Sequence, residues 1–379
     1  MKALVRLLSI GCCRACRTGQ TRCRFVTNGI SVQLVFHPIQ FFSKVFSVTG
    51  SRFLMKQIVW FALLMIFAAS VSYIVFGANY FSTISGVQED AKDVNKPTSK
   101  LKRTGVIQEL DLRENSGIDF SIQYEDAIWM HNDSGSPTLF LIGTNGQTLA
   151  KCYVNRSKNR DWEDISTFAW KGKPYVAIAD VGDNFKRRKS CQLYLIEEPK
   201  FEINKEHAVT HTIRKHKKID FKYEDGPRDC ESVVFDAKTR SIWLVEKIFS
   251  EVSKDKIPGV YQLRLNDDLT AESGIAKRVA EYSVRNATGA DLHGDTLVIR
   301  NYVFAHKIQL DGDWEKAFKK KQFETVPLPI QRQGEAICFD PQGEAVFVTS
   351  EFTRQSLYRV ELSKPAAPSA SSSKPGSEN

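Results

Sequence analysis

The chain has 379 residues and a formal net charge of +9 at pH 7. All of the excess positive charge lies in residues 1–56, which contain nine lysines and arginines and no aspartate or glutamate. The rest of the chain is therefore neutral overall, without the basic surface that phosphate backbones require, and we expect no nucleic-acid partner. The length suits a single β-propeller or β-barrel domain with extensions.

The basic head, residues 1–56, carries four cysteines, of which Cys13 and Cys16 form a C-x-x-C pair. No second correctly spaced pair or histidine follows, so we favour an unstructured basic leader over a zinc site. Four more cysteines are spread through the later residues: Cys152, Cys191, Cys230 and Cys338. In an oxidising compartment they permit three pairings, and the sequence does not select among them.

A single transmembrane helix is predicted over residues 57–78. The stretch from Ile58 to Ala78 contains 21 residues without a charge, which at ~1.5 Å per residue spans ~30 Å of hydrocarbon. The lipid bilayer is therefore an expected partner through residues 58–78. Because positive flanks stay in the cytoplasm, we expect a cytoplasmic N-terminus and a periplasmic or extracellular domain. A start at Met55 would make the same run a secretory signal or signal anchor, and both starts remain open.

The remaining chain divides into three parts. Residues 79–103 are polar and are predicted to form a flexible linker. Residues 104–362 contain the apolar runs of a folded domain, and residues 363–379 are rich in Ser, Pro and Ala and are predicted to be disordered.

The folded domain contains an internal repeat. Five segments share a small polar or acidic residue, a small residue and an aliphatic one: 116–118, 163–165, 231–233, 288–290 and 335–337. A second apolar run follows each segment, and a third follows most of them. Short aromatic and β-branched runs between Gly, Pro, Asn and Asp are typical of strands, and four-stranded repeats of ~40–50 residues are typical of propeller blades.

We therefore predict an all-β domain, a β-propeller of five or six blades. A sixth blade would lie in the 68-residue gap between the second and third segments. Residues 105–112 are expected to close the ring by pairing with the last blade, which protects the sheet edges. A β-sandwich is the alternative, but the regular repeat favours the propeller.

Several motifs resemble those of a family of bacterial β-propeller proteins without an established activity. They are NSGI at 115–118, IWMHNDSG at 128–135, DWEDI at 161–165, ADVGDN at 179–184, EEP at 197–199, EDGPRDCES at 224–232, TGAD at 288–291 and QGEAICFDPQGEAVFVTSE at 333–351. The resemblance covers residues 104–362. It implies a distant similarity to calcium-dependent six-bladed propellers, including gluconolactonase-like and phytase-like proteins. The chain departs from a complete acidic ring at Thr288.

The propeller geometry predicts an acidic site. Inner strands begin at one mouth of the central channel, and second strands end there. The glutamates at the first position of three repeat segments should therefore lie close together at that mouth. The predicted calcium ligands are Glu163, Glu231, Glu335, Asp133 and Asp183, because crowded carboxylates repel and calcium takes oxygen ligands. The other expected mouth residues are Asn132, Asp180, Asn184, Glu246, Asn301 and Glu351. Asp133 and Asp183 also fit Asx turns without any ligand.

Three functions remain open. The first is a metal-dependent hydrolase of an ester, lactone or phosphate, with His131 as general base and Arg300 orienting an anionic substrate. A lone histidine is more often a core or turn residue, which weakens that role. The second is a non-enzymatic binding or scaffold module of the cell envelope. The third is a quinone-cofactor dehydrogenase on the same fold.

Overall fold

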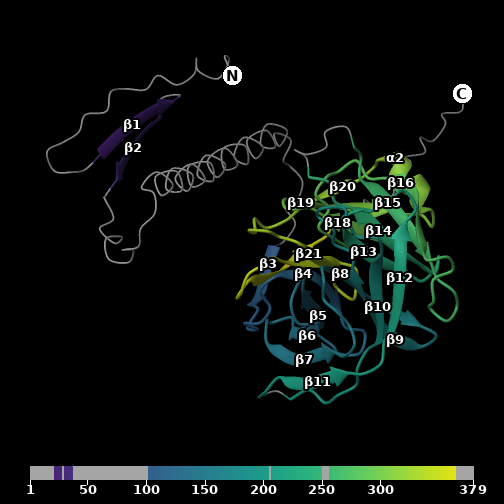
Figure 1. Cartoon of the computed structure of the whole chain (residues 1–379). Helices are drawn as coiled ribbons and strands as arrows, with labels where there is room; N and C mark the ends of the chain where they lie inside the picture. Colours follow the sequence, from purple (N-terminus) through teal and green to yellow (C-terminus); the bar gives the residue numbers. More distant parts are fainter. Residues whose placement is uncertain (1–20, 28–29, 37–100, 205, 250–255, 364–379) are drawn as a thin grey trace, which may run out of the picture. The chain divides into compact units, whose positions relative to one another are not determined.

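The computed structural model describes residues 21–27, 30–36, 101–204, 206–249 and 256–363. The chain forms two units, residues 1–96 and residues 97–379 (Figure 1). In the first unit, β1 (Thr21–Thr27) pairs antiparallel with β2 (Ile30–Phe36). The prediction of an unstructured head is therefore wrong for these two strands.

The predicted transmembrane residues 57–78 lie outside the described residues, as do most of the linker and residues 364–379. In the part of the chain that is described, no helix is both long and apolar enough to cross a bilayer. The membrane helix stays a prediction. The linker ends earlier than predicted, because β3 (Leu101–Val106) already includes residues 101–103.

The second unit contains five four-stranded antiparallel units, which we call blades 1 to 5. The outermost strands of blades 2 and 3 also pair in parallel, which joins these two blades in one eight-stranded sheet. Blade 1 contains β4 (Asn115–Phe120), β5 (Ala127–Asn132), β6 (Thr138–Gly143) and β7 (Thr148–Val154). Blade 2 contains β8 (Trp162–Trp170), β9 (Lys173–Asp180), β10 (Cys191–Glu197) and β12 (Lys217–Tyr223). Blade 3 contains β13 (Cys230–Asp236), β14 (Ser241–Glu246), β15 (Gly259–Arg264) and β16 (Ile275–Glu281).

Blade 4 contains β17 (Gly289–His293), β18 (Thr296–Arg300), β19 (Phe304–Gln309) and β20 (Glu324–Pro327), and blade 5 contains β21 (Ala336–Phe339), β22 (Ala345–Thr349), β23 (Ser356–Glu361) and β3. The first strand of each blade is innermost. Each inner strand contacts the inner strand of the next blade, and β21 contacts β4. The described residues therefore form a closed β-propeller of five blades.

The predicted closing strand is present and lies slightly earlier than expected. β3 pairs antiparallel with β23, placing Leu357 opposite Gly105, so the two ends of the domain share one sheet. The 68-residue gap holds no sixth blade. It contains the outer strands of blade 2 and β11 (Val209–Ile213), which adds to β7 in parallel at the edge of blade 1.

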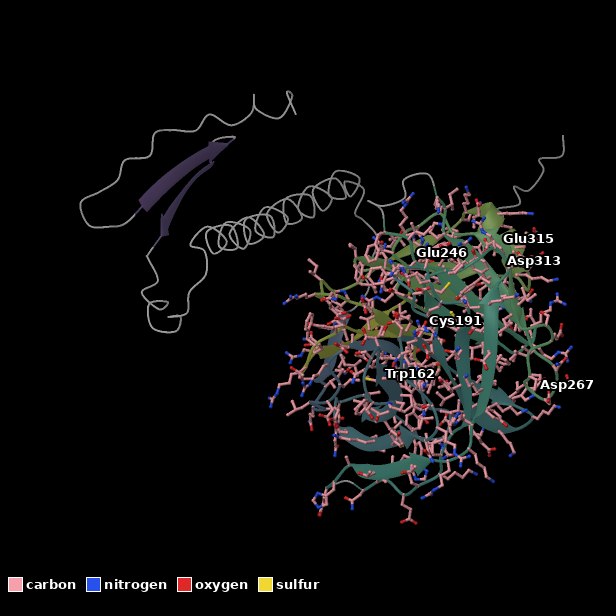
Figure 2. All side chains as sticks on the ribbon, viewed as in Figure 1. Trp162, Cys191, Glu246, Asp267, Asp313 and Glu315 are labelled. Atoms are coloured by element: carbon pink, nitrogen blue, oxygen red, sulfur yellow. The ribbon has the colours of Figure 1, made fainter. Side chains whose placement is uncertain are left out.

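The hydrophobic core is divided into five clusters, one between each pair of neighbouring blades. The cluster between blades 1 and 2, for example, contains Trp129 of blade 1 and Trp162 of blade 2. Between blades 3 and 4, helix α2 (Trp314–Lys320) follows its N-cap Asp313 and stacks Trp314 on Trp243, with ring centroids 4.1 Å apart. The four domain cysteines are buried free thiols. Figure 2 shows the side chains that fill the blades.

Three aspartates join the inner strands along the channel axis. The buried carboxylate of Asp164 accepts the backbone N–H groups of Val233 in blade 3 (2.8 Å) and Ala290 in blade 4 (3.1 Å). Asp119 accepts from Thr167 in blade 2, and Asp291 accepts from Phe339 in blade 5. Inner strands have one edge without a partner strand, and buried N–H groups need acceptors. These carboxylates supply them.

We expect Asp164→Ala to destabilise the propeller by about 3 kcal/mol or more. The backbone N–H groups of Ile165, Val233 and Ala290, in blades 2, 3 and 4, lose their acceptor, and each loss costs ~1–3 kcal/mol. Urea unfolding followed by circular dichroism measures the change. Asp267→Ala, at an exposed position on the outer edge (Figure 2), is the matched control and should stay within ~0.5 kcal/mol of the parent. Equal midpoints for the two variants would contradict the proposed role of Asp164.

Candidate functional site

The mouth is the end of the central channel at which the inner strands begin. Glu163, Glu231 and Glu335 stand at the beginnings of β8, β13 and β21, and all three are buried. Burial raises the pKa of Glu163 well above its ordinary value, and the nearby Glu231 carboxylate adds to the shift. Burial likewise raises the pKa of Glu231 well above its ordinary value, and Glu335 adds to that shift. The structure therefore brings the three predicted glutamates together.

A buried lysine lies among these acids. The Lys247 ammonium donates to both carboxylate oxygens of Glu231, and it lies over the rings of Phe249 and Tyr302, 4.9 and 5.4 Å from their centroids. Burial by itself would lower the pKa of Lys247, but Glu231 outweighs it and raises the pKa. Lys247 is therefore held as a cation between a carboxylate and two aromatic rings.

Neighbouring side chains extend this network across blades. The Tyr302 hydroxyl donates to Glu335 (3.2 Å), joining blade 4 to blade 5. Glu246, marked in Figure 2, accepts from Lys186 of blade 2 (2.7 Å) and from the Gly259 backbone (3.1 Å). The mouth is thus a mixed array of carboxylates and cations rather than a ring of acids alone.

Two further aspartates deepen the negative charge. Burial raises the pKa of Asp161 to about 6, and Asp229 contributes to the shift. A Cβ added to Gly182 would collide with the carboxylates of Glu163 and Asp161. Glycine in the ADVGDN motif therefore lets this loop approach the acids closely.

The outer part of the mouth contains carboxyl groups that titrate near neutral pH. Burial and the neighbouring Glu335 raise the pKa of Glu351 to about 8. Burial and Glu114 raise the pKa of Asp133 to about 7. Several acids at the mouth therefore hold protons that a cationic ligand would displace.

The two predicted catalytic residues are fully buried. Burial lowers the pKa of His131 to about 4, and its Nδ1 lies 3.1 Å from the Asn132 carbonyl oxygen. Arg300 donates to the carbonyl oxygens of Ala336 (2.7 Å) and Thr349 (3.1 Å) and ties blade 4 to blade 5. Among the residues that the structure describes, His131 Nε2 and one terminal nitrogen of Arg300 have no hydrogen-bond partner. Because both side chains are buried, this geometry does not favour their predicted roles.

Most of the other predicted mouth residues brace turns. Asp183 accepts from the Arg188 backbone (2.7 Å), and Asn132 accepts from the backbones of Arg113 and Glu114. Asn301 likewise accepts from two backbone N–H groups, those of Val303 and Phe304. Asp180 is paired with Arg188 (2.8 Å), and Asn184 is exposed.

These positions fit calcium poorly. Calcium takes six to eight oxygen ligands, but Lys247 occupies both oxygens of Glu231, and Asp183 is engaged in its own loop. Within the described residues, no group of three or more acidic, histidine or cysteine side chains is arranged to hold a metal ion. No step of the function proposed below depends on calcium.

Sequence reasoning missed Lys247, Tyr302, Asp161 and Asp229. A signal for Lys247 was present, because it follows Glu246 at the end of a second strand, where the mouth residues were sought. Asp161 and Asp229 lie two residues before the repeat glutamates, in the DWED and RDCE motifs. The pairing of Lys247 with Glu231 had no such signal, because it depends on how the end of β14 packs.

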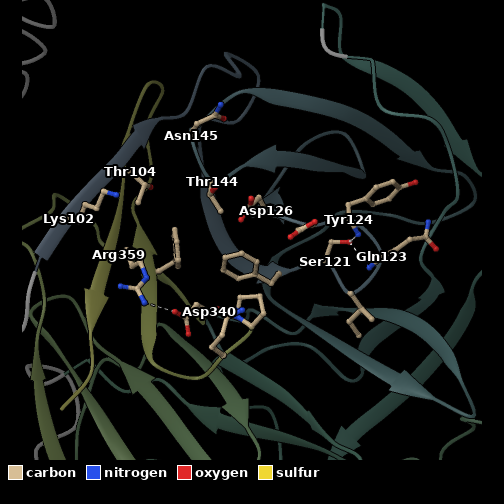
Figure 3. Close-up of a pocket in the computed structure, with 16 residues that line it drawn as sticks. Lys102, Thr104, Ser121, Gln123, Tyr124, Asp126, Thr144, Asn145, Asp340 and Arg359 are labelled. Atoms are coloured by element: carbon tan, nitrogen blue, oxygen red, sulfur yellow. Dashed lines mark hydrogen bonds and ion pairs between the residues drawn. The ribbon is translucent and has the colours of Figure 1, made fainter. Parts of the chain in front are cut away.

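A separate cavity of about 660 Å³ lies between blades 1 and 5 (Figure 3). Its wall from blade 5 carries Lys102 and Arg359, and its wall from blade 1 carries the turn 121–126. Arg359 is already paired with Asp340 (2.8 Å). The cavity begins where β4 ends, so it lies at the opposite end of that strand from the mouth and contains none of the predicted site residues.

The fold and the mouth define a class of protein, a five-bladed β-propeller with a predominantly acidic axial mouth. No family model and no curated protein matches the chain. The WD40 domain of Neurospora crassa Pan2 is similar at 11% identity and a TM-score of 0.37, over 71% of this chain and 98% of that one.

Two enzymes are similar at the same level. A gluconolactonase from Xanthomonas campestris matches at 10% identity and a TM-score of 0.40, over 70% of this chain and 90% of that one. A glutaminyl cyclase from Myxococcus xanthus matches at 10% identity and a TM-score of 0.36, over 71% of this chain and 100% of that one. The strand pairings, not these likenesses, establish the propeller.

We expect the stability of the protein to fall with rising pH through Glu351. The pKa of Glu351 is about 8 in the folded protein and ~4.5 in the unfolded chain, so the folded state holds the proton more tightly. The resulting stabilisation is fully present below pH ~4.5 and is lost as the pH rises through about 8. Between about pH 5 and about pH 9, the urea midpoint of the parent should fall more than that of Glu351→Gln. In the control Glu315→Gln, at an exposed position of α2, the urea midpoint should fall by the same amount as in the parent. Identical slopes for parent and Glu351→Gln would contradict the assignment.

Proposed function

We propose that this protein is a binding module of the cell envelope that receives a cationic group of its ligand in the acidic mouth. The observation that carries the proposal is the site of Lys247. There the protein already holds an ammonium group between the Glu231 carboxylate and the rings of Phe249 and Tyr302. Carboxylates and aromatic faces are the groups that recognise organic cations.

The remaining carboxyl groups provide oxygen atoms that a second positive charge could contact. Glu163, Asp161 and Glu335 lie close to the Lys247 pair, and burial raises the pKa of the first two. An incoming ammonium group would stabilise their charged forms, so binding would release protons. The envelope location in this proposal rests on the uncharged run at residues 58–78, which would tether the propeller to the bilayer.

A hydrolase is the second candidate. It is favoured by Glu351 and Asp133, whose pKa values of about 8 and about 7 suit proton transfer near neutral pH. It would act on an ester, a lactone or a phosphate without help from His131, which is buried.

The binding proposal predicts that removing an acidic side chain from the mouth weakens ligand binding and that removing the basic side chain of Lys247 strengthens it. Isothermal titration calorimetry should show that Glu163→Gln and Glu335→Gln each weaken spermine binding at least tenfold, since one charged contact is worth ~1.5–3 kcal/mol. Lys247→Met should bind spermine more tightly, because it removes a competing ammonium group. Glu315→Gln, far from the mouth on α2, is the control. Spermine affinity that is unchanged in all three mouth variants would contradict the proposal.

The hydrolase candidate predicts turnover that depends on Glu351. Activity on a panel of ester, lactone and phosphate substrates should fall at least tenfold in Glu351→Gln, because the variant cannot exchange a proton. The binding proposal instead predicts no turnover by the parent.

A parallel experiment tests the predicted calcium site. The urea midpoint is measured at increasing calcium concentrations, and a saturable increase that Glu163→Gln abolishes would favour that site.

A further inference from the structure

Exposed apolar side chains gather around the mouth. In the described part of the chain, ten large hydrophobic side chains are exposed, and six of them lie in loops that precede inner strands or follow second strands. These six are Leu110, Phe185, Phe249, Ile257, Val303 and Ile330. Phe185 and Ile330 are the most exposed, at 78% and 86%. Because such loops all lie at the mouth end, we call this set the apolar rim.

Contacts between neighbouring loops link the rim through blades 2, 3 and 4. Lys186, next to Phe185, bonds Glu246 at the end of β14. The adjacent Lys247 lies over Phe249 and over Tyr302, the neighbour of Val303. The rim therefore follows the acidic centre from one blade to the next.

The chain of contacts continues through blades 5 and 1. The guanidinium of Arg332, in the loop of Ile330, lies 4.6 Å from the ring centroid of Phe352. The Phe352 backbone donates to the Arg113 carbonyl oxygen (2.6 Å), and Arg113 Nε donates to the carbonyl oxygen of Leu110 (3.2 Å). Apolar groups thus surround the carboxylates on all five blades.

This composition selects among possible partners. A small polyamine would satisfy the carboxylates but would leave the apolar rim uncovered. The acids at the centre disfavour an anionic lipid surface or a nucleic acid there. The rim itself is mixed in charge, because Lys186, Arg187, Arg188 and Lys189 follow Phe185. A polypeptide can present a basic side chain and apolar neighbours together, and exposed apolar patches commonly mark interaction sites.

We propose that the mouth end docks a polypeptide segment, with a lysine or arginine side chain entering the acidic mouth and apolar neighbours covering Phe185 and Ile330. This inference rests on the proposed function, because it uses the same acids to receive the cation. It adds the class of partner, and it assigns specificity to rim residues that bear no charge.

The test uses the full-length chain and two fluorescein-labelled nine-residue peptides, each with one central lysine. One peptide carries leucines on both sides of the lysine, and the other carries serines at the same positions. We expect the leucine peptide to bind at least tenfold more tightly, measured by fluorescence anisotropy. The double substitution Phe185→Ser with Ile330→Ser should reduce that preference to about twofold and leave spermine affinity unchanged.

The matched control is Ile122→Ser with Ile203→Ser, which removes two exposed apolar side chains outside the mouth loops. It should retain the full preference for leucine. Equal binding of both peptides by the parent, with spermine still bound, would overturn the polypeptide inference and leave the proposed function standing. Failure of spermine and of both peptides to bind would overturn both. An equal loss of preference in the control would also overturn the role of the rim.

Discussion

The propeller depends on how the inward edges of its five inner strands are satisfied. Each edge presents backbone N–H groups to a narrow buried channel, where no further strand can pair with them. Asp164 accepts two of these groups from blades 3 and 4, and Asp119 and Asp291 accept others. Room for Asp164 exists because the matching positions in the other blades are small, among them Gly117 and Gly289. Burial raises the pKa values of these carboxyl groups. They are retained because they complete the backbone hydrogen bonding of several sheets at once.

The same construction positions the functional residues. Glu163 directly precedes Asp164, so the carboxylate that fixes the axis also fixes where the mouth carboxylate stands. Arg300 acts similarly by binding carbonyl oxygens of blade 5 beside Glu335. A mouth built on strands that are bonded to one another can hold several carboxylates close together, because the framework resists the repulsion that would otherwise separate them.

The chemistry of the mouth follows from its mixture of charges. Glu231 is already paired with Lys247, and the carboxyl groups of Glu163 and Glu335 lie beside this pair. This arrangement is better matched to an organic cation than to calcium, which needs many oxygen ligands that are not engaged elsewhere. The apolar rim surrounds this centre with groups that gain from contact with a partner, and so extends recognition beyond charge.

The sequence by itself determined the strands, the repeat, the closing strand and the convergence of three glutamates, because each follows from local periodicity and from the position of a residue within its blade. Tertiary structure decided the number of blades, since the long gap between repeats holds β11 at the edge of blade 1 instead of a sixth blade. It also decided the burial of His131 and Arg300 and the pairing of Lys247 with Glu231. These features depend on packing between blades that are distant in the sequence. The sequence of one repeat does not indicate which side chains of the neighbouring blade will contact it.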